Sequence, residues 1–204
     1  MWALIEDGSI TKFINNPKGM IIDDIQYSKK IFSLWSVAEK EAKGIYEVIQ
    51  NNAKKKDEEY YNNTNQTFTY DADAGTVTAT YGDATAKAHA DTLFTSDDED
   101  NGLGTEGEVK AEGLKTVKIR NIKQQAASEL ARTDWYIVRK ADADTAVPSA
   151  ITNHRAAVRT KCAAMETLVT NASNTAPIET LYTYTTDGDG VTSRPLGELP
   201  TLEV

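Results

Sequence analysis

The residues most able to supply a nucleophile and a general base are Cys162 and the two histidines, His89 and His154. His154 lies eight residues before Cys162 in a stretch with helical periodicity. Eight residues of helix span about 12 Å, whereas a nucleophile and its base must approach to about 3 Å. We therefore expect a surface histidine and a buried, inert thiol. The sequence predicts that this chain is not an enzyme.

Two acidic clusters raise the question of calcium, Asp97–Asp100 and Asp187–Asp189. Neither has the alternating oxygen ligands, the central glycine and the final glutamate of an EF-hand loop. Solvated loops are the favoured interpretation, and calcium binding stays open. Gly102–Gly104 lacks the Lys-Ser/Thr pair of a phosphate-binding loop. No carboxylate pair has a sequence setting that is typical of a glycosidase. We predict no metal and no cofactor.

Charge and composition exclude several classes of partner. The chain has 204 residues, with 22 Lys and Arg against 31 Asp and Glu, for a net charge of −9. Phosphate backbones and anionic membranes attract clustered basic residues, so we expect neither nucleic acid nor membrane as a partner. The single cysteine allows no intrachain disulfide and fits a reducing cytoplasm. No stretch approaches the roughly 18 apolar residues of a membrane span, and the N-terminus does not resemble a signal peptide.

The N-terminal part has the patterns of a small, mainly β domain, which we place at residues 1–94. Asp7-Gly8 is a strong hairpin turn signal, and Gly44 suits the end of a helix. Thr and apolar residues alternate between 65 and 90, which indicates antiparallel strands. The predicted elements are a hairpin at 1–14, a strand at 20–22, a helix at 29–43, a strand at 45–49 and antiparallel strands within 65–90.

The C-terminal part has helical periodicity. An acidic, Gly-rich stretch at 95–108 is the predicted linker. Apolar residues at helical spacing predict helices at 109–132 and 149–170, with Ser149 as a candidate cap beside Pro148. Two helices of similar length suggest an antiparallel helical hairpin over 109–170. The tail at 171–204 is predicted to be extended, with a short strand at 181–184.

Trp135 lies in the connector at 133–149, just past the first long helix. A tryptophan buries a large area, so we interpret Trp135 mainly as a plug over the open end of the two-helix core. Thr133 or Asp134 would bond local backbone groups and fix the chain reversal. The alternative is that this region contacts a partner. The candidate interface residues are Trp135, Tyr136, Arg155 and Arg159.

Several short motifs resemble those of phage tail-fibre assembly proteins. Ala127–Trp135 is similar to the helix end and Thr-Asp-Trp of the family's C-terminal motif, with Pro148 and His154–Arg159 in the places of its following connector and helix. Met1–Gly8 looks like the family's opening strand and turn, and Gly44–Val48 looks like its short Gly-Val-Tyr-x-Val strand. The resemblance covers residues 1–49 and 122–162. The Thr-rich strands and the tail have no counterpart in it.

The expected fold is α+β, with a small antiparallel β N-terminal region that includes a short helix, and a C-terminal antiparallel helical hairpin. The resemblance implies a non-enzymatic bacteriophage tail-associated protein with a chaperone-like role. It would assemble or attach tail fibres in the host cytoplasm and would also be compatible with retention in the virion tail. Exposed sheet edges offer strand addition as a second binding mode.

Two alternatives stand beside this hypothesis. The Thr-rich strands and the acidic charge also suit a virion structural or decoration subunit on the capsid or fibre surface. A glycan-degrading tail enzyme has the least support. The sequence leaves open the partner's identity, the copy number and whether the chain forms a homo-oligomer.

Overall fold

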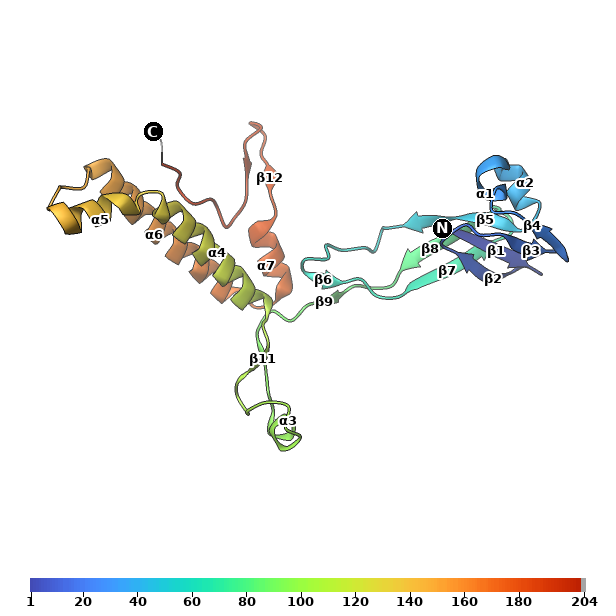
Figure 1. The fold of residues 1–204 in the computed structure, drawn as a ribbon, viewed down its shortest axis with the longest axis horizontal. Coiled ribbons are helices and arrows are strands. Elements are labelled where there is room, and N and C mark those ends of the chain that lie inside the picture. The colour runs from blue at the N-terminus through green and yellow to red at the C-terminus, as the bar shows by residue number, and fades with distance from the viewer. Residues whose placement is uncertain (203–204) are drawn as a thin grey trace. The chain divides into compact units, whose positions relative to one another are not determined.

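The computed structural model describes residues 1–202 as two compact units, which divide between Thr85 and Ala86 (Figure 1). The fold is mixed α+β, as predicted, with seven helices and a curled five-stranded sheet plus small two-stranded sheets within the described residues. The predicted linker at 95–108 lies inside the second unit. The last two residues of the predicted tail are outside the described residues.

The first unit is built on a sheet with strand order β2-β1-β5-β8-β7. The pair β5–β8 is parallel and the other neighbours are antiparallel. The prediction of a wholly antiparallel region is therefore wrong at this pair. The hairpin of β7 and β8 inserts its second strand beside β5, so β8 runs in the direction of β5. The strands are β1 (Trp2–Glu6), β2 (Ser9–Ile14), β5 (Ile45–Asn51), β7 (Gln66–Asp71) and β8 (Thr76–Tyr81).

Both faces of this sheet carry a buried core. One face contributes Leu4 and Ile45, which pack beneath β3 (Met20–Ile22), β4 (Ile25–Tyr27) and two short helices. The other face packs Val48 and Val77 together with aromatic rings. The sheet curls so that the tilted rings of Phe13 on β2 and Phe68 on β7 are in contact, with centroids 4.4 Å apart. Side chains from the two edge strands therefore meet, which reduces the room for an added strand.

The predicted helix at 29–43 is divided in two. The first part, α1, is Ile31–Leu34, and the second, α2, is Val37–Glu41. Ser36 begins the second helix through a capping box, because its Oγ accepts the Glu39 N–H while the Glu39 carboxylate accepts the Ser36 N–H. This local signal ends α1 with Trp35 in an extended conformation.

The predicted hairpin at 1–14 and the strands at 20–22 and 45–49 are confirmed. Asp7, Gly8 and Gly44 all have positive φ, as their turn positions require. The first unit ends near the small pair of β6 (Tyr61–Asn62) and β9 (Thr85–Ala86).

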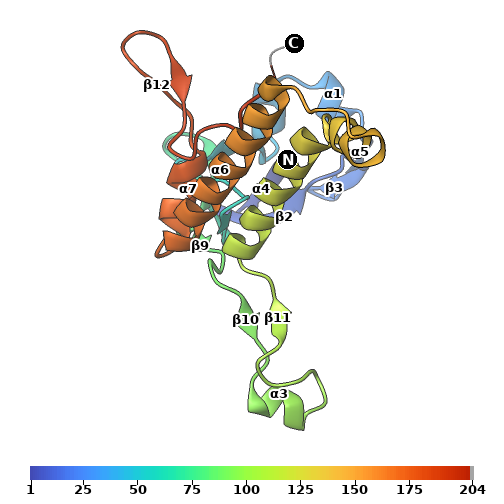
Figure 2. The same ribbon diagram turned by 90° about the vertical axis from the view of Figure 1, so that its left-hand side faces the viewer.

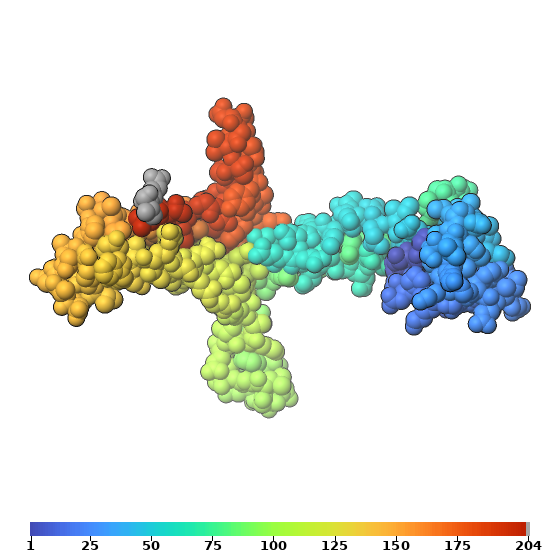
Figure 3. Space-filling view, turned by 45° about the horizontal axis from the view of Figure 1, so that its top comes forward, coloured from blue at the N-terminus to red at the C-terminus, as the bar shows by residue number. Residues whose placement is uncertain are grey.

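The second unit contains a projecting arm (Figure 3), which is built on two paired strands. Its strands are β10 (Thr92–Leu93) and β11 (Val109–Ala111), with the helix α3 (Ser96–Asp100) between them. The predicted start of a long helix at 109 is wrong, because Phe94 exchanges backbone hydrogen bonds with Gly107 and Glu108 and holds β11 in a hairpin. The predicted linker thus includes a helix and connects two paired strands.

Within the described residues, the arm is followed by helices α4 to α7, which Figure 2 labels. They are α4 (Leu114–Ala131), α5 (Asp134–Ala143), α6 (Ser149–Asn171) and α7 (Thr175–Tyr182). Lys115 near the start of α4 bonds Thr170 near the end of α6, whereas Leu130 near the end of α4 meets Arg155 early in α6. The long helices α4 and α6 therefore run in opposite directions, with the additional helix α5 in the predicted connector.

The tail is more ordered than predicted. The strand expected at 181–184 is wrong, because Asn174 caps α7 and the helix continues to Tyr182. A small pair of β12 (Thr185–Thr186) and β13 (Thr192–Ser193) follows. Leu196 is then fully buried with Ile122, Met165 and Val169. Ser149 begins α6 without capping it, since Pro148 is the N-cap residue.

Gly44→Ala tests the backbone constraint at the end of α2. Gly44 has φ +72°, and a Cβ there would lie 2.3 Å from the Ile5 carbonyl oxygen. We expect the substitution to lower the free energy of unfolding by about 2 kcal/mol or more, measured by denaturation followed by tryptophan fluorescence, to which Trp2 and Trp35 of the first unit contribute. Gly8→Ala is the control, with a similar φ but open space around it, and should cost about 1 kcal/mol. Equal losses in both variants would contradict the steric argument.

Candidate partner-binding surface

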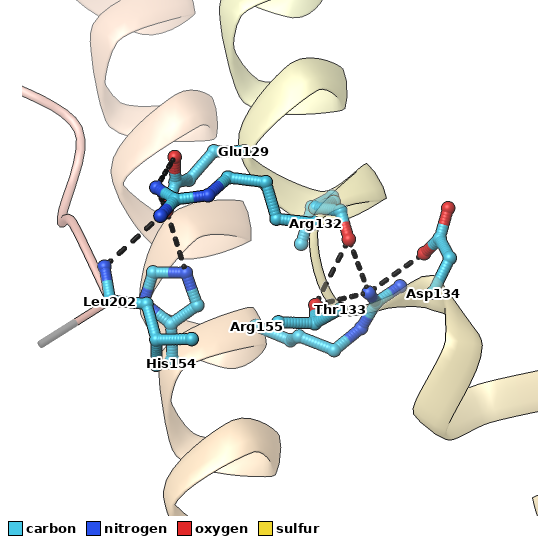
Figure 4. Close-up of polar contacts among 8 residues, drawn as sticks. Glu129, Arg132, Thr133, Asp134, His154, Arg155 and Leu202 are labelled. Atoms are coloured by element: carbon cyan, nitrogen blue, oxygen red, sulfur yellow. Dashed lines mark hydrogen bonds and ion pairs between the residues drawn. The ribbon is translucent and has the colours of Figure 1, made fainter. Parts of the chain in front are cut away.

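Arg155 connects three helices at one end of the second unit (Figure 4). It lies in α6 and is only 8% exposed. Its Nη1 lies 2.7 Å from the Leu130 carbonyl oxygen, 2.7 Å from Thr133 Oγ1 and 2.8 Å from Asp134 Oδ1. Thr133 is itself buried and donates from Oγ1 to the Leu130 carbonyl at 2.9 Å.

These contacts place a positive charge at the end of α4 and a negative charge at the start of α5. The last carbonyls of α4 lack intrahelical partners and carry partial negative charge, which a cation stabilises. Asp134 stands in the first turn of α5, where a carboxylate is favourable. Arg155 therefore ties the end of α4 to the start of α5. Thr133 makes the predicted hydrogen bond to a local backbone group, the Leu130 carbonyl. Arg155 forms its ion pair with Asp134 of the same chain.

Trp135 does not plug the helix pair. It is 55% exposed in α5, a helix with no buried residue. The prediction is wrong because Thr133 and the Arg155 guanidinium occupy the space at the helix ends, which leaves Trp135 on the outer surface. Its ring lies 5.3 Å from the Tyr136 ring, centroid to centroid, and the Arg139 guanidinium carbon lies 4.7 Å from its centroid. Val138, 65% exposed, adds apolar surface to the same helix.

The four predicted interface residues thus have different positions. Trp135 and Tyr136 lie together on α5, whereas Arg155 is buried and acts as a positioning residue. Arg159 is exposed one turn further along α6, with a long contact of 3.5 Å to the Arg155 carbonyl oxygen. Arg139 was missed, although its spacing of four residues from Trp135 is the spacing at which helical neighbours meet. No carboxylate in residues 1–202 pairs with Arg139.

A second polar cluster lies beside the first, around Glu129 of α4 (Figure 4). Its carboxylate is 3.0 Å from Arg132 Nη1, accepts the Leu202 N–H at 3.3 Å and is 3.2 Å from His154 Nε2. The last contact is a close approach without hydrogen-bond alignment. The predicted surface position of His154 is wrong, because its imidazole is buried and lies against the Glu129 carboxylate. The hydrogen bond from the Arg132 side chain is the main cause that lowers the pKa of Glu129, and the Leu202 N–H also lowers it.

Cys162 lies apart from His154, as its spacing predicts, and is partly buried. Its thiol lies 3.3 Å from a Glu166 carboxylate oxygen. Burial, together with this carboxylate, raises the pKa of the thiol, which keeps it protonated and poorly nucleophilic.

The acidic clusters are used within the chain. Asp98 belongs to α3, and Asp187 accepts the N–H groups of Asp189 and Val191 in the turn between β12 and β13. Within residues 1–202, no group of three or more His, Cys, Asp or Glu side chains is arranged to hold a metal ion. In the same part of the chain, no helix combines the length and apolar character that crossing a membrane requires.

Comparison with known proteins finds no matching family model, no similar curated protein and no similar solved structure. The resemblance to tail-fibre assembly proteins therefore stays a prediction. The α5 surface, defined by Trp135, Tyr136, Val138 and Arg139, is the candidate functional site on geometric grounds.

Arg155→Met should destabilise the second unit by about 2–4 kcal/mol, because it removes a buried guanidinium and its contacts with Leu130, Thr133 and Asp134. Chemical denaturation followed by far-ultraviolet circular dichroism measures the change. Asp134→Ala is the matched control, since its carboxylate is more than half exposed and should cost under about 1 kcal/mol. An equal effect of the two substitutions would show that the exposed ion pair, and not the buried contacts, stabilises the reversal.

The Glu129 cluster predicts a pH dependence of stability. Because the pKa of Glu129 in the folded chain lies below its ordinary value of 4.5, its stabilising contribution is complete above that value and is lost as pH falls through the folded pKa. We expect the free energy of unfolding to fall below pH 4.5, and Glu129→Gln to reduce that fall. Denaturation curves at a series of pH values measure it. Parallel pH profiles for the two proteins would disprove the assignment.

Proposed function

We propose that this chain is a non-enzymatic bacteriophage tail-associated protein, which assembles or attaches tail fibres by binding a tail or tail-fibre protein through α5. The observation that carries the proposal is the exposure of Trp135 and Val138 on a helix with no buried residue. A ten-residue helix is marginal in water by itself. A partner that covers this apolar surface would stabilise it.

The residue types on α5 favour a protein partner. Trp, Tyr and Arg are the residues most often responsible for binding energy in protein interfaces. The Arg139 guanidinium lies against the Trp135 ring and within cation–π distance of the Tyr136 ring, which pre-orders it for a carboxylate. An amphipathic helix that enters a groove on its partner is a common recognition mode. The surface suits a groove with an apolar floor and an acidic rim.

The resemblance supplies the phage context of the proposal. We infer that α4 and α6 correspond to the two arms of the family's helical hairpin, with α5 inserted where the chain reverses. In this interpretation Thr133 and Asp134 of the Thr-Asp-Trp motif receive Arg155, while Trp135 faces the partner. The protein would act in the host cytoplasm during assembly, and retention in the virion tail is compatible with the same contact.

Trp135→Ala tests the proposed surface. With the tail-fibre protein from the same phage as the partner, we expect about 2 kcal/mol of lost affinity, or roughly a 30-fold higher Kd, measured by calorimetry. Leu34→Ala is the control, because Leu34 is an apolar side chain on the first unit and, at 73% against 55%, is more exposed than Trp135. Unchanged affinity for Trp135→Ala would contradict the role of α5. A chain found in virions in fixed copy number without any tail or fibre partner would instead favour a decoration subunit.

A further inference from the structure

The arm of the second unit, residues 91–112, concentrates negative charge. It holds eight acidic residues and one basic residue, Lys110. All residues of its two short strands are exposed. Leu103, beyond α3, is 62% exposed, and Leu93 and Val109 are also exposed. The arm therefore presents apolar side chains surrounded by carboxylates.

The tip of the arm is held in a defined shape. Thr95 and Asp98 form a capping box at the start of α3, and Lys110 pairs with Asp98 at 2.7 Å. The Lys110 ammonium and the Thr95 N–H lower the pKa of Asp98 to about 2. Glu99 accepts the Glu106 N–H across the loop that carries Leu103. These contacts order the tip, although a short two-stranded hairpin is only marginally stable by itself.

The helices that follow carry the opposite charge. Residues 114–171 contain ten basic and five acidic side chains. A shallow, largely open groove lies along one exposed face of α4, and all of its lining residues belong to that helix. Ile119 and Ala127 give it an apolar floor, and Arg120 and Lys123 stand on its rim. Its lining consists of Thr116, Ile119, Arg120, Lys123, Gln124 and Ala127.

The rim cations can exchange partners at little cost. Arg120 pairs with Glu112 and Lys123 with Glu166, and the two basic side chains are 47% and 60% exposed. Ion pairs this exposed contribute little to stability. Arg120 already binds a carboxylate from the base of its own arm, which shows that the groove rim accepts acidic groups.

We propose that the arm of one copy of this chain docks in the α4 groove of a second copy. Leu103 would cover the apolar floor, and the carboxylates of Asp100 and Glu106 would meet the rim cations. The arm is directed away from its own α4 in both ribbon views (Figures 1 and 2), so its own groove is out of reach of the tip. Two arms repel each other, which excludes an arm-to-arm contact. Because the two surfaces differ, the contact builds a ring or a filament.

Complementary charge reversal tests the contact by sedimentation velocity of the full chain. The arm variant is Asp100→Lys with Glu106→Lys, and the groove variant is Lys123→Glu with Gln124→Glu. We expect the wild type to assemble at low salt and to dissociate as salt screens the charges. Each variant should sediment as a monomer, and an equimolar mixture of the two should assemble again, because reversed arms then meet reversed grooves.

Glu6→Lys with Asp73→Lys is the matched control for the arm variant, since it makes the same charge change as that variant on exposed positions of the first unit. It should assemble like the wild type. Circular dichroism checks that every variant is folded. Three results would overturn the proposal: a wild type that is monomeric at low salt, an arm variant that still assembles, or a mixture of the two variants that stays monomeric. Trp135→Ala should leave this assembly intact, which separates the contact from partner binding by α5.

Discussion

The arrangement of the second unit depends on one buried guanidinium. Arg155 sits where α4 ends, α5 begins and α6 passes, and its Nη1 contacts an acceptor from the end of α4, from Thr133 and from the first residue of α5. Burying a cation costs free energy unless its hydrogen bonds are supplied. Part of the cost is offset here by the Leu130 carbonyl, the Thr133 hydroxyl and the Asp134 carboxylate around Nη1. The direction in which α5 leaves the core follows from this contact.

As a consequence, α5 lies on the surface of the second unit, without a buried residue. Since Thr133 and Arg155 fill the space between the helix ends, Trp135 has no internal site and lies at the surface with Tyr136 and Arg139. In the first unit, by contrast, the sheet buries side chains on both faces, and side chains of its two edge strands meet at Phe13 and Phe68. The uncovered apolar surfaces that carry our proposals, α5 and the acidic arm, both belong to the second unit.

Local patterns were sufficient for much of the fold. The Asp7-Gly8 turn, the strands at 20–22 and 45–49 and the helix at 149–170 depend on neighbouring residues, and the structure contains them. The capping box at Ser36 was also legible in the sequence as Ser-x-x-Glu, although the helix at 29–43 was predicted without it. The errors in strand arrangement fall on nonlocal pairing. The parallel contact of β5 with β8 and the pairing of β10 with β11 join segments whose partners no local pattern identifies.

The sequence by itself determined the chemical inventory: an acidic chain with one thiol and two distant histidines, an acidic Gly-rich stretch, and a Thr-Asp-Trp motif between two helical segments. Only the tertiary structure decided how these residues are used. In the structure Arg155 and His154 are buried and Trp135 is exposed. The segment predicted as a linker forms the arm, since it connects the paired strands β10 and β11. The physical reason is that residue type sets what a side chain can bond. Whether it is buried, and against which partner, depends on chain segments that lie far away in the sequence.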